Sequence, residues 1–130
     1  GTGDAQLTMA QKIKLSGAII VSTPQDIALL DARKGIEMFR KTNVPVLGII
    51  ENMSTYICTN CGHEEHIFGH GGAQKEAKKL GTAFLGDIPL NTSIRINSDE
   101  GIPASLSAPE SEYAKKFDVI AKEISTRLKT

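Results

Sequence analysis

The chain has 130 residues, a length typical of one domain, and 40% of them are apolar, which is enough for a packed core. Its 15 basic residues balance its 15 acidic ones, so the basic excess of a nucleic-acid-binding surface is missing and we expect no nucleic-acid partner. No apolar run approaches the roughly 20 residues that span a bilayer, and we expect no membrane association.

Three short apolar runs predict buried strands, at Ala18–Val21, Val44–Ile50 and Phe84–Leu90. None alternates strictly between apolar and polar residues, which is typical of strands that are covered by helices on both faces. Helical stretches lie between and after these runs. Repeated strand–helix–strand units at this spacing predict an α/β fold with a mostly parallel sheet.

The helices are predicted from their caps and their apolar periodicity. Residues 23–42 begin with Thr23 as the expected N-cap and Pro24 in the first turn. A shorter helix over 71–81 ends at Gly81. In the last helix, Ser107 and Glu110 are expected to form a capping box ahead of one apolar stripe. The stripe consists of Tyr113, Phe117, Ile120, Ile124 and Leu128.

Every cysteine and every histidine of the chain falls within residues 58–70. Cys58 and Cys61 have the C-x-x-C spacing of a metal-binding turn, and Gly62 can adopt the positive φ that such a turn needs. A redox dithiol is disfavoured, because its first cysteine should begin a helix and a polar run follows here. Two unligated thiols remain a further alternative. The absence of a larger disulfide framework indicates a reducing compartment.

The spacing leaves two metal-binding arrangements open. His66 and His70 can complete a Cys₂His₂ zinc site within one chain, whereas His63 is too close to Cys61 to do so comfortably. Alternatively, two copies of the loop, related by a two-fold axis, supply four thiolates to one bridging site. Each histidine taken singly is expected to be a solvated loop residue or a hydrogen-bonding neighbour.

Several segments follow one another in the order of one known family. They are GTGDAQLTMAQ, GAIIVSTPQDIALLDARKGIEMF, VPVLGIIENMS, the C-x-x-C, HIFGHGGA, LGDIPL and R-x-x-S-D-x-G-x-P. In this order the chain resembles the Mrp/ApbC family of P-loop ATPases, iron–sulfur cluster carriers related to MinD and the nitrogenase iron protein. The resemblance implies that residues 1–130 are the C-terminal part of one doubly wound P-loop NTPase domain, with a metal loop inserted at about 53–70.

The resemblance also implies a function and a ligand set. Members of the family are expected to hold one [4Fe–4S] cluster across a homodimer and to transfer it to apo iron–sulfur proteins. On this basis the ligands are Cys58 and Cys61, and the C-x-x-C loop forms the dimer contact. A cytoplasmic protein is expected, or one of the mitochondrial matrix in a eukaryote.

Nucleotide-binding residues are assigned through the same resemblance, and no catalytic residue is assigned. Gly1, Thr2, Gly3 and Asp4 match the end of the switch II loop, which senses the γ-phosphate and Mg²⁺ of ATP. Asn52 matches the contact to the adenine base, with Pro89 and Asp87 on the other side of the base. Physically, Asn52 follows a predicted parallel strand, where α/β sheets bind ligands, and its amide can both donate and accept.

The chain departs from the family because it contains no G-x-x-x-x-G-K-[ST] loop to hold the phosphates. It also opens on glycine rather than methionine, and we interpret it as a fragment that lacks the Walker A half. The whole protein is expected to hydrolyse ATP, whereas this chain alone is expected to be inactive and to bind ATP weakly or not at all. An exposed sheet edge is expected as well.

Two other functions fit the same residues. The loop can hold structural zinc in an interaction module, or the whole protein can be a MinD-like positioning ATPase with an incidental C-x-x-C. Arg95, Ser98 and Asp99 match the family pattern, and for them we predict only a structural role ahead of the last helix.

Overall fold

The computed structural model describes residues 4–128, which form six helices and four strands within that range. In chain order they are α1 (Asp4–Lys12), β1 (Ala18–Ser22), α2 (Asp26–Lys41), β2 (Val46–Ile57), β3 (Glu64–Glu65), α3 (Gly72–Leu80), β4 (Phe84–Leu90), α4 (Thr92–Glu100), α5 (Ala104–Ser107) and α6 (Glu112–Leu128).

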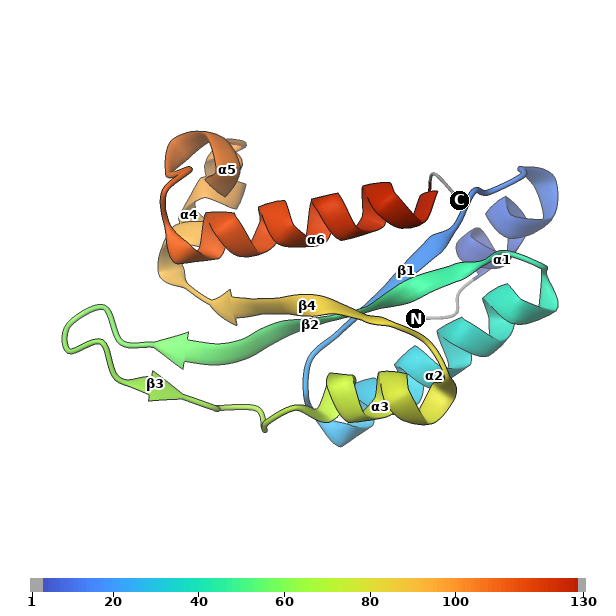
Figure 1. The fold of residues 1–130 in the computed structure, drawn as a ribbon, viewed down its shortest axis with the longest axis horizontal. Coiled ribbons are helices and arrows are strands. Elements are labelled where there is room, and N and C mark those ends of the chain that lie inside the picture. The colour runs from blue at the N-terminus through green and yellow to red at the C-terminus, as the bar shows by residue number, and fades with distance from the viewer. Residues whose placement is uncertain (1–3, 129–130) are drawn as a thin grey trace.

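Strand β2 is the centre of the sheet. It pairs in parallel with β1 on one side and with β4 on the other, and the short β3 folds back antiparallel onto its far end. Helix α6 covers one face of this sheet, and helices α2 and α3 cover the other (Figure 1). The predicted α/β fold with a mostly parallel sheet is confirmed.

The core consists of two layers, one on each face of the sheet. One layer packs Ile49 against α2 and α3, through Leu29, Ile36, Ala73 and Ala77. The other packs Ile50 and β4 against α6, through Leu85, Ile88 and Ile120. Ile49 and Ile50 are neighbours in β2 and are both buried, in opposite layers. Two-sided burial therefore explains why β2 shows no strict alternation.

Helix α2 begins later than its sequence predicts. Its N-cap is Gln25, which makes no side-chain capping bond, so the expected N-cap at Thr23 is wrong. The Thr23 hydroxyl instead donates to the side-chain oxygen of Gln25 at 3.3 Å. Pro24 therefore precedes the cap and lies in the loop rather than in the first helical turn.

The capping box predicted for the last helix is also wrong. Ser107 ends the separate short helix α5, where its hydroxyl accepts a 2.8 Å bond from the Asn97 amide. Ala108 has non-helical dihedrals, as expected for a residue that precedes a proline. Helix α6 starts after this break, and its first turn is capped by Ser111, whose hydroxyl accepts from the backbone N–H of Ala114.

The apolar stripe of α6 is only partly buried. Ile120 is 6% exposed and Ile124 packs beside it, but Phe117 is 40% exposed and Leu128 is 49% exposed. Helix α3, in contrast, ends as predicted, with Gly81 at φ +71° after its last residue. Helices α1, α4 and α5 were not predicted, although Asn91 caps α4 through its side chain and Gly101 ends it.

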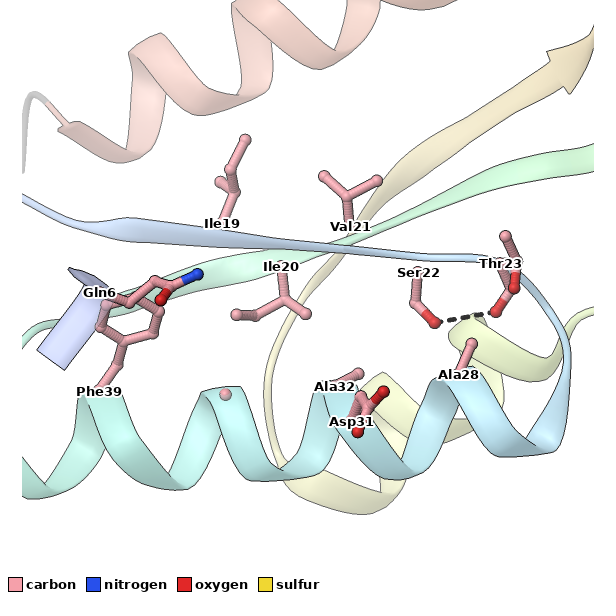
Figure 2. Close-up of a pocket in the computed structure, with 11 residues that line it drawn as sticks. Gln6, Ile19, Ile20, Val21, Ser22, Thr23, Ala28, Asp31, Ala32 and Phe39 are labelled. Carbon is pink, nitrogen blue, oxygen red and sulfur yellow. Dashed lines mark hydrogen bonds between the residues drawn. The ribbon is translucent and has the colours of Figure 1, made fainter. Parts of the chain in front are cut away.

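Strand β1 forms an edge of the described sheet, since it pairs with β2 alone. Ile20 points toward α2, whereas Ile19 and Val21 point away from it (Figure 2). Those two side chains are 39% and 57% exposed. A hollow of about 440 Å³ lies between β1 and α2, and both apolar and polar side chains line it, the polar ones being Gln6, Ser22, Thr23 and Asp31.

Candidate functional site

Both cysteines lie in the tight turn that joins β2 to β3. We call this segment, residues 56–65, the thiol hairpin. Its strands pair through Tyr56 with Glu65 and Ile57 with Glu64. The turn is closed by two backbone hydrogen bonds, from Cys58 N–H to the His63 carbonyl at 2.9 Å and from Gly62 N–H to the Cys58 carbonyl at 2.8 Å. The hairpin extends away from α2 and α3 at one end of the molecule (Figure 1).

Gly62 is required in this turn for its backbone conformation. Its φ of +74° lies in the left-handed region, and an added Cβ would meet nothing within 4 Å. The sequence prediction that a glycine after the second cysteine serves a positive φ is therefore confirmed.

The two thiols are free and differ in their surroundings. Cys58 is half-buried, and Cys61 is exposed. The backbone N–H of Cys61, followed by that of Asn60 and the Cys61 side chain, holds the pKa of the Cys58 thiol below its ordinary value. Because hydrogen bonds to sulfur favour the charged form, the turn favours the thiolate of Cys58.

The three histidines do not surround the thiols. His63 contributes its backbone carbonyl to the turn, and its side chain is exposed. His66 and His70 follow β3 and lie against each other, with their Nδ1 atoms 3.3 Å apart. Within residues 4–128, no three His, Cys, Asp or Glu side chains are grouped so that they could hold a metal ion, so a one-chain Cys₂His₂ site is not preformed there.

Asn52 lies within β2, not after it. The strand was expected to end at Ile50, but pairing with β3 extends it to Ile57. The regular parallel pairing nevertheless stops at Asn52, which is opposite Ile88, and the next residue, Met53, has φ +54°. Asn52 is half-buried. It therefore marks the carboxyl end of the parallel ladder even though the strand continues.

Asp87 and Pro89 flank Ile88, the residue that pairs with Asn52, so the three predicted nucleotide residues come from adjacent positions of two paired strands. Pro89 is buried. The Asp87 carboxylate is engaged, at 3.1 Å, by both Lys116 of α6 and the Ser54 hydroxyl. This geometry gives Asp87 a bracing role between β4, β2 and α6.

The remaining predicted positions lie at the start of the chain. Asp4 begins helix α1 and is exposed. Gly1, Thr2 and Gly3 lie outside the described residues. Arg95 and Asp99 form an exposed ion pair within α4, and the Ser98 hydroxyl donates to the Ile94 carbonyl. These contacts lie within α4 itself, and the structural role predicted for the three residues stays a prediction.

The sequence did not single out two buried polar residues of β2 that lie beside these positions. Glu51 is 4% exposed, and its carboxylate accepts from the backbone N–H of Ala73 at the start of α3. Ser54 is 3% exposed and bonds both Asp87 and the Ile88 carbonyl. A charged residue directly after the apolar run VLGII is the sequence feature that could have drawn attention to Glu51.

Comparison with known families gives a match over residues 1–125, to the ParA family model described as "NUBPL iron-transfer P-loop NTPase". The chain belongs to this family. The resemblance to P-loop ATPases of iron–sulfur carrier type is thereby confirmed.

Two curated relatives show how much of a longer protein the chain spans. It is 56% identical over 128 residues to the "Iron-sulfur cluster carrier protein" of Escherichia coli K12, a match over 98% of this chain and 35% of that protein. It is 57% identical over 130 residues to the "Iron-sulfur cluster transfer protein NUBPL" of Mus musculus, over 100% of this chain and 41% of that protein. The chain therefore spans well under half the length of each.

Solved structures show the same fold. A nucleotide-binding protein of Archaeoglobus fulgidus in complex with ADP matches with a TM-score of 0.71 and 39% identity, over 87% of this chain and 45% of that chain. The cell division ATPase MinD of Pyrococcus furiosus matches with a TM-score of 0.68 and 28% identity, over 86% of this chain and 43% of that chain. Of the described helices, none is both long and apolar enough to cross a membrane.

Proposed function

We propose that the chain is the C-terminal part of an ATP-dependent iron–sulfur cluster carrier, which holds a [4Fe–4S] cluster as cargo and delivers it to apo iron–sulfur proteins. The observation that carries this proposal is the pair of free thiols at the exposed turn of the thiol hairpin, of which Cys58 has a lowered pKa. The family match and the names of the curated relatives support it.

The cluster is shared between two copies of the chain. A [4Fe–4S] cluster takes four thiolates, and one hairpin supplies two, Cys58 and Cys61. Because the hairpin extends from the body, a second copy can approach its turn along a two-fold axis, which makes the contact isologous. A homodimer is therefore proposed because two chains are needed to supply the four thiolates.

Delivery follows from the exposure of the same thiols. An incoming thiolate of the apo-protein bonds to an iron atom, and the Cys58 or Cys61 thiolate that it replaces leaves, so charge and electron count are unchanged at each exchange. A buried ligand set would block this exchange, whereas Cys61 is exposed. Repetition of this exchange moves the cluster without a redox step.

Nucleotide binding belongs to the whole protein. Asn52 is assigned to the adenine base, with Pro89 and Asp87 beside it, and Gly1, Thr2, Gly3 and Asp4 are assigned to the phosphate- and Mg²⁺-sensing loop. Asn52 and the hairpin share strand β2, whose far end leads directly into Cys58. A strand rises about 3.3 Å per residue, so Asn52 and Cys58 are about 20 Å apart along the chain. A movement of β2 caused by nucleotide binding at Asn52 can therefore be transmitted to the thiols through this one strand.

ATP hydrolysis is likewise assigned to the whole protein, with residues 1–130 as the C-terminal part of its ATPase domain and the metal loop inserted at about 53–70. Calorimetric titration of this chain with Mg-ATP is expected to show weak or no binding, because no Walker A loop is present in its sequence. Micromolar binding by this chain would contradict the expectation.

Two alternatives are less well supported. A MinD-like positioning ATPase shares the fold, but the identity to that structure is 28%, against 56% to the bacterial iron–sulfur carrier. A structural zinc module would use the same cysteines. The proposed location is the cytoplasm or the mitochondrial matrix; a relative in Arabidopsis thaliana carries the name "Iron-sulfur protein required for NADH dehydrogenase, mitochondrial".

The test is anaerobic reconstitution with iron and sulfide, followed by visible absorption, iron and sulfide analysis, and measurement of the dimer fraction. Two irons and two sulfides per chain are expected, in a dimer. Cys58→Ala and Cys61→Ala should each abolish both the absorption and the dimer. His63→Ala, in the same turn, is the matched control and should retain both. Stoichiometric zinc with no visible absorption would favour the structural alternative, and unchanged iron in both cysteine variants would exclude the cluster assignment.

A further inference from the structure

His66 and His70 face a hollow that is separate from the thiol turn. A cleft of about 200 Å³ lies between the thiol hairpin, the sheet and the start of α3. We call it the histidine cleft. Its lining includes Glu51 from β2, Glu64 from β3, Gln74 from α3 and the two histidines from the connection between β3 and α3. His63, the third histidine, is not part of this lining.

The two imidazoles are held close together. Their Nδ1 atoms are 3.3 Å apart, their ring centroids are 4.2 Å apart, and the ring planes meet at 66°. A hydrogen bond between the two Nδ1 atoms requires a proton on one of them and a free lone pair on the other. Both Nδ1 atoms therefore converge on one small region at the cleft.

The separation of these nitrogens matches that of two ligands on one metal ion. Zinc–nitrogen bonds of about 2.0–2.1 Å place two nitrogens about 3.4 Å apart on a tetrahedral ion and about 3.0 Å apart on an octahedral one. The observed 3.3 Å lies between these values. A tautomer shift that moves the proton of one ring from Nδ1 to its own Nε2, together with small rotations of the rings, would free both Nδ1 lone pairs to bind one metal ion.

The charge of the cleft also favours a cation. Three carboxylates line it, those of Glu51, Glu64 and Asp87, and its described lining contains neither lysine nor arginine. Glu51 is engaged by the Ala73 N–H, and Asp87 is engaged by Lys116 from outside the lining. Glu64 is exposed and lies two residues before His66, so its carboxylate can turn toward an ion held by the histidines.

We propose that His66 and His70 bind one divalent transition-metal ion, with Glu64 and water completing the coordination. Imidazole and carboxylate ligands suit ions such as Zn²⁺, Co²⁺ and Fe²⁺. The described residues hold no preassembled group of three ligands, so the proposed site is an exchangeable one and not a structural zinc centre. It is independent of the cluster that we assign to Cys58 and Cys61.

The experiment is a calorimetric titration of the full chain with Zn²⁺, in a Cys58→Ser/Cys61→Ser background that removes the thiols. One equivalent should bind. His66→Ala and His70→Ala should each weaken binding at least about tenfold, because loss of even an indirect partner of a metal ligand costs that much. Glu64→Gln should weaken it less. His63→Ala is the matched control, and its affinity should equal that of the background.

Equal affinity in His66→Ala, His70→Ala and the background would overturn the proposal, as would the absence of binding in the background. Circular dichroism of each variant checks folding. If a histidine variant does not fold, imidazole NMR signals of the folded background decide the question. Zn²⁺ should shift the signals of His66 and His70 and leave those of His63 unchanged. If Zn²⁺ instead shifts the signals of His63 and not those of His66 and His70, the proposed metal site is wrong, and the cluster proposal is unaffected.

Discussion

The Glu51 carboxylate accepts a 3.0 Å hydrogen bond from the backbone N–H of Ala73, which ties strand β2 to the first turn of helix α3. That helix has no side-chain capping bond of its own, because its N-cap residue is Gly71. A buried carboxylate from a neighbouring strand therefore does what a capping side chain usually does, and its negative charge lies at the positive end of the helix.

Removal of this tertiary cap is expected to destabilise the fold. Glu51→Ala leaves the Ala73 N–H buried without a partner and should lower the free energy of unfolding by about 1–3 kcal/mol, measured by urea denaturation. Glu51→Gln keeps an acceptor oxygen and should lose less. Glu65→Ala, at an exposed position of β3, is the control. Equal effects of Glu51→Ala and Glu65→Ala would show that the bond contributes nothing.

Stability should depend on pH through Glu76. The side chain of Arg33 donates a hydrogen bond to the Glu76 carboxylate, which is 7% exposed, and holds the pKa of Glu76 below its ordinary value of about 4.5. A lowered pKa in the folded state adds stability above the unfolded-state pKa, and this stability is lost as pH falls through the folded-state pKa.

Urea denaturation between pH 3 and 7 measures this contribution. The unmodified chain should lose stability as pH falls below about 4.5, and Glu76→Gln, which cannot titrate, should give a flatter curve in that window. Asp99→Asn is the control, since the ion pair of Asp99 with Arg95 is exposed and such pairs contribute little. Parallel curves for the unmodified chain and Glu76→Gln would contradict the assignment.

The reactivity of Cys58 should show its lowered pKa directly. Alkylation of Cys58 by iodoacetamide, followed by mass spectrometry across pH 5–10, should rise at a lower pH in the folded chain than in the same chain unfolded in urea. Gly62→Ala strains the turn that positions the backbone N–H donors and should shift the folded profile toward the unfolded one. Coincident folded and unfolded profiles would show that the turn does not stabilise the thiolate.

Close packing of the loop before α3 predicts a steric effect at Gly72. A Cβ there would lie 2.6 Å from the Pro24 carbonyl oxygen and 3.1 Å from Leu29 Cδ1, so Gly72→Ala forces the loop away from the start of α2. We expect a loss of about 1–3 kcal/mol in the free energy of unfolding, measured by urea denaturation. Gly71→Asn is the control.

Gly71 has a left-handed φ of +67° and no atom within 4 Å of an added Cβ. Asn tolerates that conformation, so Gly71→Asn should cost about 1 kcal/mol or less. If the two substitutions have equal effects, the contact of Gly72 with Pro24 does not limit the packing.

The sequence was sufficient for features that depend on neighbouring residues. The apolar runs located β1 and β4 and the buried start of β2, and the two-sided burial of Ile49 and Ile50 explains the missing alternation in β2. In β1, however, Ile19 and Val21 are exposed, so the burial predicted for that strand is only partly correct. The C-x-x-C turn needs only Cys58, Cys61 and a glycine that can adopt a positive φ. Gly81 likewise ends α3 within its own turn. The turn and the helix end each close within a few residues, and a buried strand is marked by its own apolar run, so these features can be recognised from consecutive residues.

Contacts between distant residues were decided by the tertiary structure alone. Pairing with β3 carries β2 past Asn52 to Ile57. The break at Ala108 that separates Ser107 from α6 is, in contrast, a local effect of the proline that follows it. Glu51 caps helix α3, which begins 21 residues later in the sequence (72 − 51). Capping patterns in a sequence involve residues within one helical turn, so this cap could not be predicted. The convergence of His66 and His70 on one cleft, apart from the thiols, depends on how the connection between β3 and α3 packs. Sequence spacing indicates which histidines and cysteines are candidate ligands, but only the packing decides which of them lie together.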